Sequence, residues 1–246
     1  MTSSSQPRSR NILLSSLDEE DFEALAPHLQ RRALEPGQTI LEAHAAIESL
    51  CFPEGGVASF HEILKDGSRV GVGIIGFEGL TGWSVLLGCR RSPHEATIAI
   101  GGGTALCIGA DDLLHACRER PKLNELLLRF VQTFVNQMGR TIFSNLTDPV
   151  ERRLARWLLM NHDRLEGDEI DLTHQQIGVM LGVRRASVTD ALHVLEGQGT
   201  VRSTRGRIII RDRARLELLA GEAYGVAEAE YGRIIAPFAK KGLGQP

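Results

Sequence analysis

The sequence predicts an α+β protein built in three successive parts: an N-terminal β-roll of the jelly-roll type, a long helix and a C-terminal winged helix-turn-helix. Short β-favouring runs between Gly-rich turns occupy residues 33–110. A long stretch follows in which apolar residues recur every three or four positions. Segment 172–210 then contains two helical patterns joined by a short turn and followed by a hairpin, which is the layout of a winged helix-turn-helix.

The first part, residues 18–120, is expected to form the β-roll. Acidic residues in the first turn predict a short helix over residues 18–28. The β-favouring runs are residues 38–41, 50–52, 57–64, 68–75, 96–100 and 105–108. Several short strands at regular spacing are typical of a small barrel or jelly roll, and the interior of such a roll can hold a small ligand.

The second part is a long helix over residues 121–146, preceded by a short helix over residues 111–118. The apolar residues at steps of three or four are Leu123, Leu127, Phe130, Phe134, Met138 and Ile142. A helix with so wide an apolar surface needs two neighbours, of which its own roll is one. We expect the second to be the same helix of another subunit, which places these six residues at a homodimer interface. Burial within one monomer is the alternative.

The third part, residues 148–220, is expected to form the winged helix-turn-helix. Thr173 and Gln176 predict a capping box at the start of its first helix. Gly182 predicts a left-handed residue that ends this helix sharply. The second helix has one apolar stripe, formed by Val188, Leu192 and Leu195. Two short strands around Gly206 predict the wing.

Charge in this third part indicates a nucleic-acid partner. Residues 174–213 contain seven arginines and three carboxylates, a local charge of +4 in a chain whose net charge is −3. Arginine binds phosphate or guanine with two hydrogen bonds, and the local field decides such binding. The residues predicted to contact double-stranded DNA are Thr173, His174, Gln175, Arg184, Arg185, Ala186, Ser187, Thr189, Asp190, Arg205 and Arg207. The alternative is a signalling module whose helix-turn-helix contacts protein instead.

Composition argues against several other classes. Cys51, Cys89, Cys107 and Cys117 are widely spaced and form no C-x-x-C pair, which predicts buried free thiols in a reducing cytoplasm and no zinc or iron–sulfur site. A redox-sensing cysteine stays open. The chain has no H-x-H, H-E-x-x-H or G-x-S-x-G motif and no P-loop, so we expect neither an enzyme nor a bound metal. A cupin-type enzyme would need inward-facing His and Glu residues in the roll.

The chain also lacks the segments that target a protein to membranes. It contains no run of about 18 apolar residues and no apolar core of a signal peptide. We therefore expect a cytoplasmic protein with no membrane partner. Residues 1–10 and 238–246 are expected to be flexible tails.

The order of roll, long helix and winged helix-turn-helix resembles the Crp/Fnr family of bacterial transcription regulators. The segments DPVERRLARWLL, LTHQQIGVMLGV and LEGQGTVRSTRGRIIIRDRARL carry the resemblance, which covers roughly residues 18–220. It implies a cyclic-nucleotide-binding-like roll and a homodimer whose two recognition helices enter successive major grooves. It also implies contact with RNA polymerase and an effector in the roll that acts on DNA binding through the long helix.

The resemblance carries over unevenly to the reading helix. Family members read bases with the first two turns of the second helix. Arg185 matches a common DNA-contacting arginine, whereas Ala186 replaces the commonly paired Glu and Asp190 replaces a downstream Arg. Asp190 could accept a hydrogen bond from a cytosine amino group. We therefore expect an operator different from those of the best-known members.

The effector site departs further from the family pattern. Cyclic-AMP-binding members carry a Gly-Glu pair followed by Arg-Ser or Arg-Thr. Gly79, Arg91 and Ser92 fit this pattern, but Leu80 replaces the Glu. A ribose hydroxyl desolvated without its charged partner costs about 1.5–3 kcal/mol, which argues against cyclic AMP. Gly79, Leu80, Arg91 and Ser92 are the candidate effector residues, and Arg91 and Ser92 are expected to bind another anion or to hold the loop. The cysteine cluster of oxygen-sensing members is absent, which argues against an iron–sulfur sensor. Haem stays open.

Overall fold

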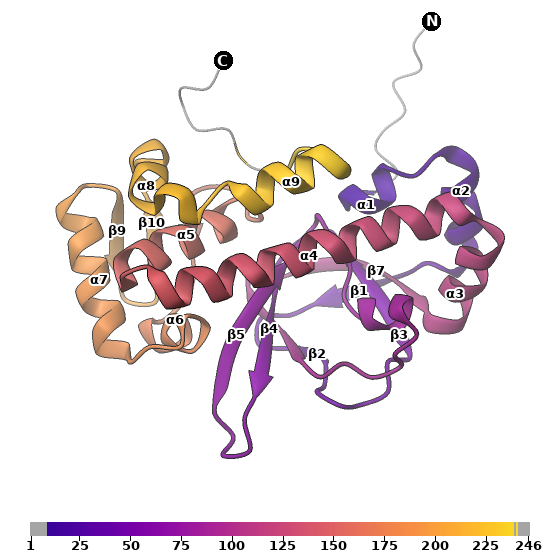
Figure 1. Cartoon of the computed structure of the whole chain (residues 1–246), viewed down its shortest axis with the longest axis horizontal. Coiled ribbons are helices and arrows are strands. Elements are labelled where there is room, and N and C mark those ends of the chain that lie inside the picture. Colours follow the sequence, from indigo (N-terminus) through magenta and orange to yellow (C-terminus); the bar gives the residue numbers. More distant parts are fainter. Residues whose placement is uncertain (1–8, 239, 241–246) are drawn as a thin grey trace, which may run out of the picture.

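The computed structural model describes residues 9–238 and residue 240. Figure 1 shows helix α4 (Pro121–Thr147) running along most of the molecule's length. The strands of the N-terminal part lie at one end of α4, and the helices and hairpin of the C-terminal part lie at the other. One helix therefore links both parts of the molecule.

Two antiparallel sheets form the roll. One sheet has the order β1-β7-β3, with β1 (Gln30–Leu34), β7 (Gly103–Gly109) and β3 (Ser49–Pro53). The other has the order β2-β6-β4-β5, with β2 (Thr39–Leu41), β6 (Glu95–Ile100), β4 (Val57–Ile63) and β5 (Arg69–Ile75). Their buried side chains share one core with α4. All six predicted strands are confirmed. Strand β1 was not predicted, because its sequence QRRAL is polar and mostly exposed.

Short helices complete the N-terminal part. They are α1 (Ile12–Ser15), α2 (Glu19–Leu25), η1 (Ala26–His28), η2 (Trp83–Leu87) and α3 (Ala110–Glu119). The Asp18 side chain caps α2 by accepting a hydrogen bond from the Asp21 backbone N–H.

The apolar stripe of α4 packs on the roll of the same chain, which corrects the predicted dimer interface. Leu123, Leu127, Phe130 and Phe134 are at most 2% exposed and belong to the roll's core. Met138 packs against the same core, whereas Ile142 is 61% exposed. Helical periodicity identified an apolar face, but it could not tell which of two neighbours covers that face.

The C-terminal part has its own core. Its elements are α5 (Val150–His162), β8 (Glu169–Ile170), α6 (His174–Leu181), α7 (Arg185–Gly197), β9 (Val201–Thr204), β10 (Arg207–Ile210) and α8 (Arg213–Ala220). The three strands form a sheet in the order β8-β10-β9. The predicted two helices and hairpin are confirmed. The two-residue strand β8 is too short to be recognised in the sequence.

The chain then folds back onto α4 through η3 (Gly221–Ala223) and α9 (Val226–Ile234). Tyr231 of α9 joins the roll's core, and the ring of Phe238 packs edge-on against it at 4.8 Å. The predicted flexible tails, residues 1–10 and 238–246, lie mostly outside the described residues. Two of their described members contradict the prediction, because Phe238 is packed and Ser9 is buried with its hydroxyl donating to Glu54.

The structure also corrects the prediction of four free thiols. Cys51 on β3 and Cys107 on β7 are register partners with a Cα–Cα distance of 4.0 Å, and they form a disulfide. Fifty-six residues separate them in the sequence, so their spacing gave no indication of the pairing. Cys117 is buried as predicted, and burial raises the pKa of its thiol to about 11. Cys89 is exposed.

Candidate nucleic-acid interface

The turn between α6 and α7 is tightly built. The Thr173 hydroxyl accepts a hydrogen bond from the Gln176 backbone N–H, and the Gln176 side chain accepts from the Thr173 backbone N–H, as the capping box requires. Gly182 ends α6 with a φ of 63°. The Val183 N–H then donates to the Gly178 carbonyl at 2.9 Å. A Cβ at Gly178 would lie 2.8 Å from the Val183 carbonyl oxygen, so the turn itself demands glycine there.

Helix α7 buries one face and exposes the other. Val188, Leu192 and Leu195 are at most 1% exposed and hold the helix against its own core. The exposed residues on the opposite face are Arg184, Arg185, Ala186 and Asp190. Arg184 is the N-cap residue but makes no capping hydrogen bond through its side chain. Arg185, Ala186 and Asp190 are thus accessible on α7, Ser187 and Thr189 are half-buried, and Arg184 is exposed just before the helix begins.

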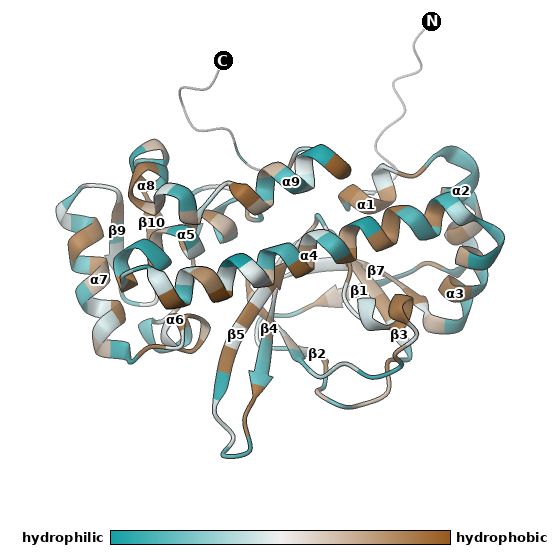
Figure 2. Ribbon diagram, viewed as in Figure 1, coloured by the Kyte–Doolittle hydropathy of each residue, from teal (hydrophilic) through white to brown (hydrophobic). Residues whose placement is uncertain are grey.

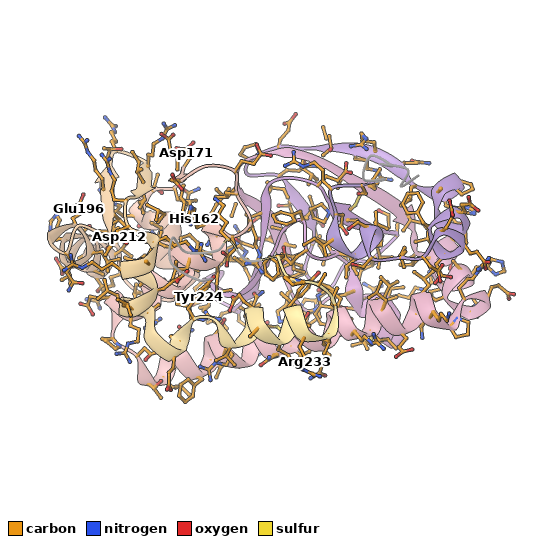
Figure 3. All side chains as sticks on the ribbon, turned by 90° about the horizontal axis from the view of Figure 1, so that it is seen from above. His162, Asp171, Glu196, Asp212, Tyr224 and Arg233 are labelled. Atoms are coloured by element: carbon orange, nitrogen blue, oxygen red, sulfur yellow. A yellow bond between two sulfur atoms is a disulfide. The ribbon has the colours of Figure 1, made fainter. Side chains whose placement is uncertain are left out.

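A groove of about 600 Å³ separates α7 from the hairpin β9–β10. Its lining brings together the predicted residues Thr173, His174, Gln175, Arg185 and Arg205 from α6, α7 and the hairpin tip. Figure 3 places Glu196 of α7 and Asp171 beside the hairpin at the same end of the molecule. The start of α6, helix α7 and the hairpin tip thus form one continuous groove.

His174 connects these elements. Its Nδ1 lies 2.9 Å from the Thr189 hydroxyl on α7, and its Nε2 lies 3.4 Å from the Ser203 hydroxyl on β9. Burial and the nearby Arg185 guanidinium lower the pKa of His174. Glu196 adds a second link that sequence reasoning missed, because its carboxylate accepts from the Ser203 backbone N–H at 2.6 Å. These contacts fix the hairpin relative to α7.

The two wing arginines differ. Among the described residues, Arg205 at the hairpin tip forms no ion pair and is exposed. The Arg207 guanidinium instead pairs with Asp171 at 2.6 Å and with Glu169 at 2.5 Å. These carboxylates raise the pKa of Arg207. The charge of Arg207 is thus already balanced by the segment that carries β8, whereas that of Arg205 is not. Residues far apart in sequence make this pairing, so composition could not reveal it.

The predicted effector residues do not converge on one site. Leu80 is fully buried, and a Cβ at Gly79 would lie 2.3 Å from the Phe130 ring. The Arg91 guanidinium donates to the His44 carbonyl at 2.6 Å, and the buried Ser92 hydroxyl donates to the His94 carbonyl at 3.0 Å. Arg91 and Ser92 therefore hold their own loop, which is the second of the two roles expected for them.

Aromatic side chains occupy the space between the roll and α4. The ring of Phe134 lies 5.2 Å from that of Phe60, 5.7 Å from that of Trp83 and 6.4 Å from that of Phe130. Such packing is typical of a filled core. The interior of the roll is thus filled by the chain's own residues where α4 crosses it.

The roll also contacts the helix-turn-helix directly, which sequence reasoning missed. Strand β5 packs on α6, where a Cβ at Gly71 would lie 2.7 Å from the Met180 carbonyl oxygen. The Met180 sulfur lies 3.1 Å from Nε2 of His61 on β4. Burial, with the nearby Arg69 charge, lowers the pKa of His61 to about 4. These contacts set the position of α6 against the roll.

Comparison with known proteins agrees with this architecture. The Crp-like helix-turn-helix domain matches residues 152–219. The FixK2 structure from Bradyrhizobium japonicum superimposes with a TM-score of 0.68 at 19% identity, over 78% of this chain and 98% of that one. A putative Crp/Fnr-family regulator from Eubacterium rectale gives 0.64 at 18% identity, over 85% and 97%. No curated protein sequence matches the chain.

The described residues also lack the features of two other classes of protein. No group of three or more His, Cys, Asp or Glu side chains is placed to hold a metal ion there. Within the same residues, no helix combines the length and apolarity needed to cross a membrane. Residues 152–219 thus form a Crp-like helix-turn-helix domain, and the chain shares the fold of roll, long helix and winged helix-turn-helix with these two structures.

Proposed function

We propose that the protein binds a specific double-stranded DNA sequence as a homodimer and thereby regulates transcription. The observation that carries this proposal is the exposed face of α7, with Arg184 and Arg185 beside a groove that ends at Arg205. An exposed helix of this kind next to a basic hairpin tip fits a major groove and its flanking phosphates.

The contacts divide into reading and positioning roles. Arg185 and Asp190 on α7 are the proposed base readers, with guanine and cytosine as their respective partners. Arg184 and Arg205 are proposed to bind phosphate. Ala186 and Ser187 lie on the same stretch and suit close approach to base edges. Thr173 and Gln175 contribute from the start of α6, and His174 and Thr189 hold the elements in register.

The dimer is proposed to form through the outer face of α4 and not through its buried stripe. The residues on that face follow an alternating four- and three-residue spacing: Leu128, Gln132, Val135, Gly139, Ile142 and Leu146. Val135, Ile142 and Leu146 are 47%, 61% and 81% exposed, and the adjacent Phe143 is 50% exposed. This is the heptad pattern of two helices packed along a common seam.

The position of α4 supports such an arrangement. Figure 3 shows α4 along one edge of the molecule, with the roll and α9 on its inner side, and Figure 2 shows apolar residues recurring along it. Exposed apolar residues over this length are typical of an interaction surface. A second copy related by a two-fold axis would present the same face and would give two α7 helices for two half-sites.

The remaining parts of the proposal come from the family. RNA polymerase is the proposed protein partner, and the cytoplasm is the proposed location. The roll is proposed to pass a signal to α6 through β5, where Gly71 meets Met180. The aromatic packing around Phe134 argues against a nucleotide in the space between the roll and α4.

The test is selection of bound duplexes from a random-sequence pool, followed by gel-shift titration of the enriched sequence at several salt concentrations. We expect a palindromic sequence with half-sites about one helical turn apart and an affinity that falls as salt rises. A protein that enriches no sequence and shows no salt-dependent affinity would exclude DNA binding. The helix-turn-helix would then be assigned to protein contacts.

A further inference from the structure

A small cavity lies where the roll, the long helix and the DNA-binding part meet. It has a volume of about 20 Å³ and is bordered by β5, α4, α5 and α6. The polar side chains that line it and matter here are Ser144 on α4 and Arg153, Arg156 and Trp157 on α5. None of the proposed reading residues of α7 lines the cavity, and the aromatic side chains that fill the roll beneath α4 do not line it either.

Three hydrogen-bonding groups at this cavity have no partner among the described residues. They are the Ser144 hydroxyl, the Arg153 Nε–H and the Trp157 indole N–H. Ser144 is 2% exposed and Trp157 is 4% exposed, so bulk water does not satisfy them. The two nitrogen groups can only donate, and the hydroxyl can turn to donate. Buried polar groups in folded proteins are almost always paired. Three unpaired donors around one cavity therefore indicate that an acceptor binds there.

Arg156 adds a buried positive charge to the same cavity. It is 5% exposed, and among the described residues it forms no ion pair. The one hydrogen bond recorded for its guanidinium goes to the Gln137 carbonyl at 3.5 Å. Burial lowers its pKa to about 10, so it stays charged at neutral pH. A charge removed from water in this way requires a counter-charge.

The charged groups around Arg156 do not supply that counter-charge by contact. Glu228 and Asp148 influence it from a distance, while Arg140 and Arg164 add further positive charge nearby. The Asp148 carboxylate pairs with Arg152, and the buried Glu78 carboxylate pairs with Arg164. The cavity is therefore electropositive, and Ser144, Arg153, Arg156 and Trp157 can donate hydrogen bonds into it, although Thr141 and Asn145 also line it.

We propose that this cavity binds one small monovalent anion, for which chloride has the right size and charge. A volume of about 20 Å³ admits one or two waters or a single monatomic ion. Phosphate and sulfate are larger and would need the four elements to separate. The bound ion would join Ser144 of α4 to Arg156 and Trp157 of α5. It would thereby strengthen the junction between the long helix and the DNA-binding part.

The first experiment measures thermal unfolding of the full chain at constant ionic strength while gluconate is replaced by chloride. We expect the wild-type midpoint to rise and then saturate as chloride increases. For Arg156→Gln, the midpoint of thermal unfolding in chloride should be no higher than in gluconate. Arg152→Gln, an exposed neighbour on the same helix, should respond like the wild type. If Arg156→Gln does not fold, Ser144→Ala replaces it, with an expected several-fold weakening of the apparent chloride affinity.

The second experiment locates the ion. Crystals soaked in bromide should show an anomalous difference peak in this cavity, within contact distance of the Arg156 guanidinium and the Ser144 hydroxyl. A cavity that holds only water under bromide would overturn the proposal. A chloride response that is equal in the wild type and in Arg156→Gln or Ser144→Ala would overturn it as well.

Discussion

Glu78 of the roll and Arg164, which follows α5, form an ion pair that is buried on both sides. The Arg164 Nε lies 2.8 Å from a Glu78 carboxylate oxygen, and the two side chains are 2% and 3% exposed. The Phe238 ring lies 5.0 Å from the Arg164 guanidinium, and the Tyr231 hydroxyl donates to the Glu78 carbonyl. The pair thus joins the roll, the DNA-binding part and the C-terminal segment at one point.

Removing one member of this pair leaves the other as an uncompensated buried charge. Glu78→Gln should therefore lower the free energy of unfolding by about 3–5 kcal/mol, as measured by urea denaturation. Glu166→Gln, which breaks an exposed pair with Arg10, should cost at most about 1 kcal/mol. The double variant Glu78→Leu/Arg164→Met should recover much of the loss. Equal effects of the two single variants would mean that the buried pair contributes no more than a surface pair.

Arg185→Ala and Arg205→Ala should affect DNA binding in different ways. Loss of a base-reading arginine should weaken specific binding by about 1–3 kcal/mol and relax the preference at one position. Loss of a phosphate contact should weaken binding to all sequences and reduce the salt slope by about one. Gel-shift titrations with specific and scrambled duplexes at several salt concentrations distinguish these outcomes. Arg118→Ala on α3, at the opposite end of the molecule, serves as the control.

Arg207→Ala should leave the salt slope close to the wild-type value, because Asp171 and Glu169 already balance this charge. Its main expected effect is a less rigid hairpin, seen as faster amide hydrogen exchange in β9 and β10. A salt slope that falls as far as in Arg205→Ala would show that Arg207 leaves its carboxylate partners to bind phosphate.

Ile142→Asp and Leu146→Asp should convert the proposed dimer to a folded monomer, as measured by sedimentation velocity and circular dichroism. Both residues lie on the exposed side of α4. Phe134→Asp should instead prevent folding, because Phe134 lies within the aromatic core of the roll. Leu218 on α8 is 81% exposed and lies outside the proposed interface. The Leu218→Asp variant should therefore stay dimeric. Dimers that persist in Ile142→Asp and Leu146→Asp would exclude the outer face of α4 as the interface.

The contact between His61 and Met180 should make stability depend on pH. Burial lowers the pKa of His61 from 6.5 to about 4, so the unfolded chain binds more protons between these values. Above pH 6.5, His61 therefore does not lower the free energy of unfolding. As the pH falls toward 4, protonation of His61 in the unfolded chain lowers the free energy of unfolding by up to about 3 kcal/mol.

The readout for His61 is the difference in unfolding free energy between the wild type and His61→Gln at each pH. Asp163, whose pKa burial raises to about 6, acts in the opposite direction over part of this range, and the comparison cancels it. The advantage of the wild type should shrink from pH 7 to pH 4. A difference that is constant with pH would mean that His61 titrates normally in the folded protein.

The sequence predicted the helices and strands better than it predicted which segments contact one another. Hydrophobic period and turn residues were sufficient for α4, for the capping box at Thr173 and for the left-handed Gly182, because these depend on residues close in the chain. The edge strand β1 was missed because four of its five residues are exposed and give no alternation. Local signals also supported the exposed face of α7.

The errors concern contacts between distant segments. Phe130 and Phe134 were placed at a subunit interface because periodicity reports an apolar face and not its neighbour. The ion pairs of Arg207 were not foreseen because its carboxylate partners lie 36 and 38 residues away in the chain. The pairing of Cys51 with Cys107 depends on the register of β3 and β7, which no motif encodes.

Gly71 has a consequence for the genetics of this protein. It lies on a strand of the roll, yet its missing side chain is what allows β5 to approach the backbone of α6 at Met180. Any other residue there would act as a wedge between the two parts. Under the proposed function, alleles with altered regulation would therefore be recovered in a codon far from those of the proposed DNA-contacting residues, and their phenotype would imitate a change of signal.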